Sequence, residues 1–231
     1  MFFLPHSKKR KIYFPEPGAL YFNPSSWHNN HSFQSPISNL TENWSQFWEE
    51  LSNQCKKNNI KLCAWMLGTH NSGIGNNYPD TSVYNAWGDP ITHSLCPFNL
   101  DVVDHFVNLS KDLVSLGVFD KILIESLEYL PLRHGHHHEV IGVDFSADID
   151  FIMSLNFSNK CLETLRQKNI DGEMIRNWVK KTTDDYFNQK SNKEVMNWSD
   201  FQSILDGEFW NYYLAREESI TCLLYTSPSP R

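Results

Sequence analysis

Glu125 is the residue whose type and position most strongly suggest chemistry. It follows Ile122, Leu123 and Ile124, so it ends an apolar run that predicts a buried strand. An ionised carboxylate inside a core costs several kcal/mol unless it is paired. At the end of a strand it can instead face a ligand, as catalytic acids often do. We predict a catalytic role for Glu125; the alternative is a structural acid just beyond the buried zone, meeting water, Arg or His.

A histidine-rich segment follows this strand. Its candidate substrate contacts are His134, His136, His137, His138 and Glu139. His136 and His138 share one side of an extended segment, and Glu139 can add a carboxylate, which is the donor set of a divalent metal. The spacing matches no zinc pattern such as HExxH. We therefore predict a polar cleft lining without metal; a divalent metal at His136, His138 and Glu139, or an exposed run without a role, are the alternatives.

Other candidate contacts lie between the two strongest apolar runs. His70 and Asn71 follow the run at residues 62–67, and Trp87 lies in the long segment beyond them. Trp87 can offer a flat surface on which a sugar ring packs. A structural histidine and a loop anchor are the competing interpretations of His70 and Trp87. His93 is a weaker candidate.

Several catalytic signatures are absent from the sequence. It contains no GxSxG elbow, no Walker loop and no GxGxxG after a strand, and Gly73-Ile74-Gly75 lacks the third glycine. We therefore predict no nucleotide cofactor.

The elements that must position these residues alternate between strands and helices. Apolar runs predict strands at residues 18–22, 62–67 and 122–127, the second with the continuous pattern of a strand buried on both faces. Between them, Asn39 and Asn99 can each cap an amphipathic helix, and Gly117 can end the second one. The order strand-helix-strand-helix-strand is typical of parallel α/β sheets.

Only helical patterns follow the third strand, at residues 148–155, 160–168, 173–189 and 198–218. A complete (β/α)₈ barrel needs about 250 residues, so we predict an α/β fold that is a partial TIM-type barrel. It has about three to four parallel strands and a helical C-terminal segment. A small doubly wound sheet is the alternative.

The end of the chain differs from the rest. Residues 222–231 read CLLYTSPSPR, which resembles the translation of a transposase-type sequencing adapter. A segment of that origin does not belong to the native protein. We predict an incomplete barrel domain at residues 1–221 and a non-native tail at residues 222–231.

Composition narrows the possible partners and compartment. The formal net charge is -7, so general attraction to nucleic acid is not expected, and the basic run at residues 8–11 is too short to change this. No apolar stretch approaches the roughly 18 residues that span a bilayer. The 5 cysteines show no CxxC spacing, which suits reduced thiols. We expect a cytoplasmic protein that partners neither membrane nor nucleic acid, and we leave its oligomeric state open.

Several motifs together carry a resemblance to a known family. They are Tyr13–Phe22, Ala64-Trp65, His70-Asn71, Leu95-Cys96-Pro97, Ile124–Leu127 and His134–Glu139. Over roughly residues 5–220 the chain resembles an uncharacterised bacterial family that is similar to TIM-barrel glycoside hydrolases of the hypothetical-glycosidase and β-galactosidase-like kind.

The resemblance implies a barrel whose fourth strand ends in Glu125, where glycoside hydrolases often place a catalytic carboxylate. It also implies an opening strand before Met1. Two departures are visible. Ile124 precedes Glu125 where many retaining barrel glycosidases carry Asn, and Cys161 alone remains of a Cys-x-x-Cys-like pair of the relatives, so we assign no metal there.

We therefore predict a glycoside hydrolase-like domain that acts on or binds carbohydrate. Glu125 is its acid/base or nucleophile, while His70 and the histidines at 136–138 bind sugar hydroxyls. Glycosidases need two carboxylates, and we expect the second on a strand that the sequence does not include, so the domain should be inactive as given. The alternatives are a metal-dependent hydrolase using the His134–Glu139 cluster and a non-catalytic sugar-binding barrel.

Overall fold

The structure is a computed structural model that describes residues 2–4, 7–12, 18–134, 142, 145–188 and 200–226. The strands are β1 (Phe2–Leu4), β2 (Ser7–Ile12), β3 (Cys63–Leu67), β4 (Ser82–Tyr84), β5 (Pro90–Leu95) and β6 (Lys121–Glu125). The α-helices are α1 (Trp27–Asn30), α2 (Trp44–Lys57), α3 (Ser72–Asn77), α4 (Leu100–Ser115), α5 (Ala147–Met153), α6 (Asn159–Gln167), α7 (Gly172–Phe187) and α8 (Glu208–Thr226). Two short 3-10 helices are η1 (Pro79–Thr81) and η2 (Phe201–Gly207).

The predicted barrel is wrong. The strands form three separate pairs, of which β1–β2 and β4–β5 are antiparallel and only β3–β6 is parallel. The described residues therefore contain neither a barrel nor a doubly wound sheet. The run at 18–22 does not join β3, because Leu20 makes only an isolated parallel bridge to Ile37. The segment at residues 69–100, whose Gly- and Asn-rich sequence without a period predicts a loop, instead contains α3, η1 and the antiparallel pair β4–β5.

One strand-helix-strand unit does form as the sequence predicts. β3 and β6 are parallel, and the chain between them includes α4. The Asn99 side chain accepts a hydrogen bond from the Asp101 amide at 3.0 Å, which confirms the predicted cap. Gly117 has φ +64, the left-handed conformation expected where the helix stops. The expected cap at Asn39 is wrong, because α2 begins later and Asn43 caps it.

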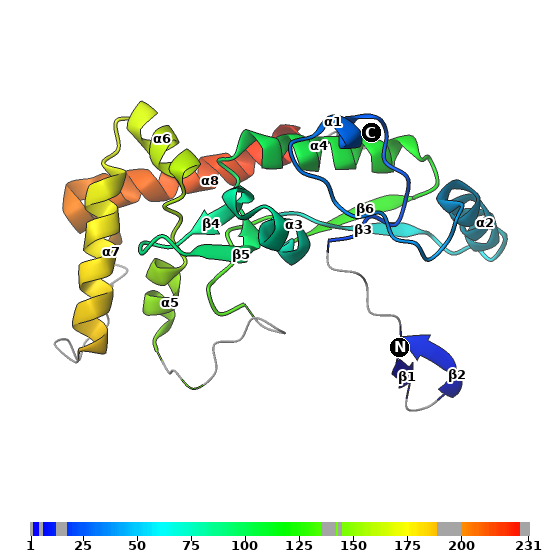
Figure 1. Cartoon of the computed structure of the whole chain (residues 1–231), viewed down its shortest axis with the longest axis horizontal. Coiled ribbons are helices and arrows are strands. Elements are labelled where there is room, and N and C mark those ends of the chain that lie inside the picture. Colours follow the sequence, from blue (N-terminus) through cyan, green and yellow to red (C-terminus); the bar gives the residue numbers. More distant parts are fainter. Residues whose placement is uncertain are drawn as a thin grey trace.

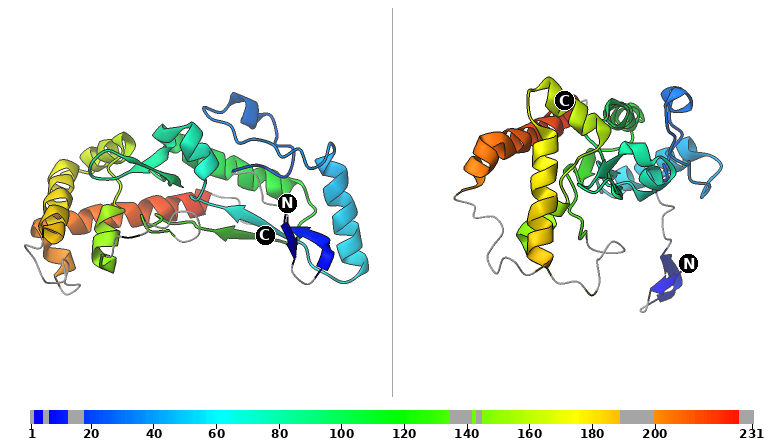
Figure 2. Two further views of the ribbon diagram at one scale, coloured as in Figure 1. Left: turned by 60° about the horizontal axis from the view of Figure 1, so that its bottom comes forward. Right: turned by 60° about the vertical axis from the view of Figure 1, so that its left-hand side comes forward.

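The first three predicted helical patterns of the C-terminal half are confirmed and correspond to α5, α6 and α7. The fourth, predicted at residues 198–218, is wrong in its bounds, because η2 covers Phe201–Gly207 and α8 begins at Glu208 and continues to Thr226. Figure 1 and the left view of Figure 2 show α5, α6 and α7 at one end of the molecule and α2 at the other, with β3 and β6 between them. Their apolar side chains form one core cluster with α8 and the segment after α5, and this cluster includes Ile149, Leu155, Ile175, Phe209 and Tyr212. In that cluster each of these five side chains is fully buried.

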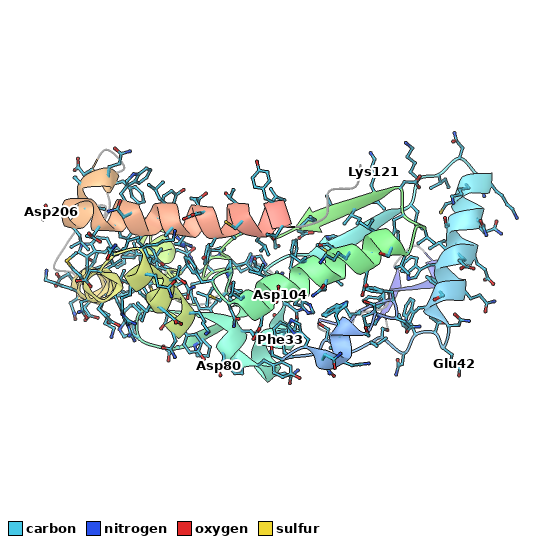
Figure 3. The ribbon with its side chains drawn as sticks, turned by 90° about the horizontal axis from the view of Figure 1, so that it is seen from above. Phe33, Glu42, Asp80, Asp104, Lys121 and Asp206 are labelled. Atoms are coloured by element: carbon cyan, nitrogen blue, oxygen red, sulfur yellow. The ribbon has the colours of Figure 1, made fainter. Side chains whose placement is uncertain are left out.

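A second core cluster lies between the β3–β6 pair and α4. Ala64 and Met66 of β3 are buried there with Phe106 and Leu113 of α4. Leu223, near the end of α8, joins the same cluster and is only 1% exposed. Figure 3 shows α4 and α8 beside the strands from above. Residues 222–226 of the segment predicted to be non-native thus form the last part of α8.

The other face of the β3–β6 pair is open. Trp65 of β3 is 69% exposed and Leu123 of β6 is 55% exposed. The prediction that β3 is buried on both faces is therefore wrong for the described chain. In the view of Figure 1, α4 lies above the strand pair and no described helix lies below it. All residues of β3 are apolar, so the sequence does not show that alternate side chains point to a covered face and to an exposed face.

No helix in the described ranges combines the length and the apolar character that crossing a bilayer requires.

Candidate functional site

Glu125 lies where the sequence places it, at the carboxyl end of β6. It is paired in register with Leu67, the last residue of β3. The Gly68 amide donates to the Glu125 carbonyl oxygen at 2.8 Å, so the two strands end at the same edge of the sheet. The Glu125 side chain is exposed, on the open face that also carries Trp65 and Leu67. A charged carboxylate can remain solvated there and reach a ligand.

The backbone directly after Glu125 is held in an uncommon conformation. Ser126 has φ 56, in the left-handed region that non-glycine residues seldom adopt. Thr69 is fully buried, and its hydroxyl hydrogen-bonds the Ser126 carbonyl oxygen at 2.7 Å and also the Glu128 carbonyl oxygen. A Cβ at Gly68 would lie only 3.0 Å from the Ser126 oxygen, so a side chain there would crowd the turn. Such constrained residues tend to gather at functional sites.

Three histidines meet near this edge: His70, His93 and His134. The ring centroids of His70 and His134 are 4.6 Å apart, those of His93 and His134 are 5.8 Å apart, and those of His70 and His93 are 6.4 Å apart. An antiparallel bridge between His70 and Ser94 brings the end of β3 against β5, which carries His93. The sequence predicts a site role for His70 and His134, and His93 is the weaker candidate.

Contacts with α5 hold His134 in the cluster. The amide of the preceding residue, Arg133, donates to the Asp150 carboxylate at 3.1 Å, and the Arg133 guanidinium lies 3.6 Å from the same carboxylate. The Leu132 amide donates to the Ser154 hydroxyl at 2.6 Å. The His93 ring nitrogen Nε2 is 3.3 Å from the Pro131 carbonyl oxygen, which ties the segment to β5.

In this cluster His70 and His134 are part-exposed whereas His93 is buried, and a neutral imidazole has one donor and one acceptor nitrogen. That combination suits the hydroxyl groups of a polar ligand. Within residues 18–134, 145–188 and 200–226, no three His, Cys, Asp or Glu side chains are grouped so that they could hold a metal ion. The predicted contacts His136, His137, His138 and Glu139 lie outside the described residues.

Asn71 and Trp87 have local structural contacts. The Asn71 side chain caps α3 by accepting from the Ile74 amide at 2.9 Å. Trp87 lies in the turn between β4 and β5 and is 38% exposed. That turn packs on α7, because the Arg176 side chain donates to the Ala86 carbonyl oxygen at 2.6 Å.

Sequence reasoning missed Trp65. It shares the open face with Glu125, but in the sequence it stands inside an unbroken apolar run. Alternation along β3 is the signal that distinguishes it: Ala64 and Met66 point to the core, so Cys63, Trp65 and Leu67 point away from it.

No protein-family model, curated protein or solved structure matches this chain.

Proposed function

We propose that the open face at the end of β3 and β6 binds carbohydrate and that the chain is a glycoside hydrolase-like domain. One observation carries the proposal: the largely exposed indole of Trp65 lies on the same sheet face as the exposed carboxylate of Glu125. Leu67 is paired with Glu125, and Trp65 stands two residues earlier in β3. Same-face diagonal neighbours on adjacent strands lie roughly 8 Å apart or closer, so a sugar ring on the indole can reach the carboxylate.

Each group has a role that fits a sugar. The indole provides an apolar plane for the C–H surface of a pyranose ring. The Glu125 carboxylate accepts hydrogen bonds from hydroxyls and, in a hydrolase, is the acid/base or nucleophile. His70 and His134, both part-exposed, lie near the same edge and place imidazole groups beside the face. Hydrolysis also needs a second carboxylate, and we assign none from the described residues.

Binding is tested first, by isothermal titration of oligosaccharides from several linkage classes into the full chain. We expect Trp65→Ala and Glu125→Gln each to weaken binding about fivefold or more, since a stacked ring or a charge-assisted hydrogen bond is worth about 1 kcal/mol or more. Tyr225→Ala and Glu49→Gln remove an exposed aromatic ring and an exposed carboxylate elsewhere, and should leave binding unchanged. A chain that binds no member of the panel, or two site variants that bind as the wild type does, contradicts the proposal.

Hydrolysis is tested separately with a panel of aryl glycosides and natural oligosaccharides. Turnover that disappears in Glu125→Gln supports a catalytic role for that carboxylate. Turnover that is unchanged in the variant removes Glu125 from the mechanism. Binding without turnover supports the non-catalytic sugar-binding alternative.

A metal-dependent hydrolase is the second candidate. The packing of His134 against His70 and His93 favours it, because imidazole is a common ligand of zinc and related metals. We rank it second, because the described residues contain no group of three side chains placed for a metal ion. Elemental analysis of the purified full chain separates the two proposals: stoichiometric metal that is lost in His93→Asn supports this candidate.

We also propose a cytoplasmic location, with neither nucleic acid nor membrane as partner. All five cysteines are free thiols, and Cys96 and Cys161 are buried, which fits a reducing compartment.

A further inference from the structure

A second group of histidines lies away from the candidate site, between α4 and the loop at residues 20–38. The loop closes on itself, because the Leu20 amide donates to the Pro36 carbonyl oxygen and the Ser38 amide donates to the Leu20 carbonyl oxygen, both at 2.8 Å. Within it, α1 and the residues after it carry an aromatic cluster that packs on one histidine of α4. The cluster consists of Trp27, His28, His31 and Phe33 from the loop and His105 from α4.

His105 is the centre of these contacts. Its ring centroid lies 5.1 Å from that of Phe33, 5.4 Å from that of Trp27 and 5.7 Å from that of His31. The side chain is only 5% exposed, and among the described residues its Nδ1 atom has no hydrogen-bond partner. A protonated imidazole has two donor nitrogens, so this environment suits the neutral ring alone.

Asp112 makes a second attachment two helical turns along α4. Its carboxylate accepts from the Trp27 indole N–H at 2.7 Å and from the Ser25 amide at 2.9 Å. Figure 3 shows this part of the loop, labelled at Phe33, lying beside α4 near Asp104. The loop is thus fastened to α4 at two points, by hydrogen bonds to Asp112 and by ring contacts with His105.

Burial and the neighbouring histidines of the loop oppose protonation of His105. The titratable groups of the surrounding elements are His28 and His31 of the loop, Asp101, Asp104 and Asp112 of α4, and Tyr78, whose ring contacts Phe33. Burial, followed by the positive charges that His31 and His28 can carry, lowers the pKa of His105 to about 3. When the loop is released, water reaches the ring and the pKa returns to its ordinary value of about 6.5.

We propose that His105 makes loop 20–38 an acid-sensitive latch, closed on α4 at neutral pH and released as the pH falls. The released state takes up a proton that the closed state excludes, so acid favours release. Below pH 6.5 the equilibrium constant for release then rises about tenfold per pH unit, until the pH nears the depressed value. Between pH 7.5 and pH 5.0 the expected increase is about 30-fold.

Hydrogen exchange followed by mass spectrometry tests this on the full chain. Exchange of the peptide covering residues 20–38 is measured from pH 7.5 to pH 5.0 and divided by the intrinsic chemical rate at each pH. We expect the corrected exchange to rise about 30-fold in the wild type and less than about threefold in His105→Leu, which cannot take up the proton. The peptide covering α6 and α7 belongs to the other core cluster and serves as the internal reference.

A matched variant distinguishes a weaker contact between loop 20–38 and α4 from the protonation of His105. Phe33→Leu weakens the ring contact without changing a titratable group, so the loop should exchange faster at every pH with the same pH dependence. A wild-type loop whose corrected exchange does not change with pH, or a His105→Leu loop with the wild-type pH dependence, overturns the proposal.

If His105→Leu does not fold, a measurement on the wild type alone still tests the proposal. Histidine ring resonances are followed by NMR while loop 20–38 stays protected from exchange. A His105 ring that remains neutral down to pH 5 in the closed state supports the latch. A ring that becomes protonated near pH 6.5 while the loop stays closed overturns it.

Discussion

Thr69 and Ser126 are joined by two hydrogen bonds. The Thr69 amide donates to the Ser126 carbonyl oxygen at 2.8 Å, and the Thr69 hydroxyl donates to the same oxygen at 2.7 Å. Thr69 follows β3 and Ser126 follows β6, so this double contact fixes the backbone that leaves both strands. It sets the position of Glu125 on one side and the direction of the segment that leads to His134 on the other.

The first prediction concerns the Thr69 hydroxyl. Thr69→Val keeps the shape of the side chain and removes the one hydroxyl proton that the carbonyl oxygens of Ser126 and Glu128 share, while the Ser126 oxygen keeps the Thr69 amide as a donor. We expect the free energy of unfolding to fall by about 1–3 kcal/mol, because both oxygens lie in a part-buried turn. Thr69→Ser, which keeps the hydroxyl, should lose less. Urea denaturation of both variants measures the difference, and equal losses would contradict a role for the hydrogen bond.

A second prediction follows from the left-handed backbone of Ser126, whose φ is 56. Ser126→Gly should raise the free energy of unfolding by up to about 1 kcal/mol, because glycine adopts this conformation without a Cβ clash. Ser126→Val should lower it by more than that, since a β-branched residue resists positive φ. Thermal denaturation of the pair checks the sign. A stabilised valine variant would show that the turn relaxes elsewhere.

The third prediction is the dependence of global stability on pH. His105 has a pKa of about 3 in the folded chain, below its ordinary value of about 6.5, so the unfolded chain binds more protons between these limits. The contribution of the neutral ring is complete above pH 6.5 and is lost as the pH falls toward 3. At pH 5 the loss amounts to about 2 kcal/mol.

Urea denaturation of the wild type and His105→Leu at pH 7.5 and pH 5.0 measures this contribution. We expect the stability difference between the two pH values to be about 2 kcal/mol smaller in the variant. The same difference in both proteins would assign the acid sensitivity to other groups.

A fourth prediction concerns the end of α8. Leu223 is 1% exposed, whereas its neighbour Leu224 is 49% exposed. Leu223→Ala removes apolar contacts with the cluster beneath α4 and should cost about 2–5 kcal/mol of unfolding free energy. Leu224→Ala should stay within about 0.5 kcal/mol of the wild type. Two variants of equal stability would show that the last turn of α8 does not pack as described.

The fifth prediction concerns thiol reactivity. Burial raises the pKa of the Cys96 thiol and raises that of Cys161 well above its usual range, while Cys63 is exposed. The thiolate is the reactive form, so Cys96 and Cys161 should resist alkylation in the native protein and react on unfolding. Mass spectrometry after a short iodoacetamide pulse locates the label. Rapid native labelling of Cys161 would place it nearer the surface than the structure does.

Local sequence signals determined several elements by themselves. Asn99 and Gly117 mark the two ends of α4 because capping depends on residues within one helical turn. Apolar spacing also located β3, β6 and the helices α5, α6 and α7, since periodicity reflects only which side of an element faces a core. The position of Glu125 at the end of β6 followed from the same local pattern.

Tertiary structure alone decided which elements meet. Whether residues 18–22 join β3 depends on partners far along the chain, and Leu20 meets Ile37 instead, so the barrel prediction failed. The exposure of Trp65 and the meeting of His93 with His70 and His134 likewise arise from long-range packing. The sequence determined which candidate residues lie at strand ends, because the ends of a strand are set by the local pattern of apolar residues. The face they share and the neighbours they touch depend on how distant segments bury their apolar surface together.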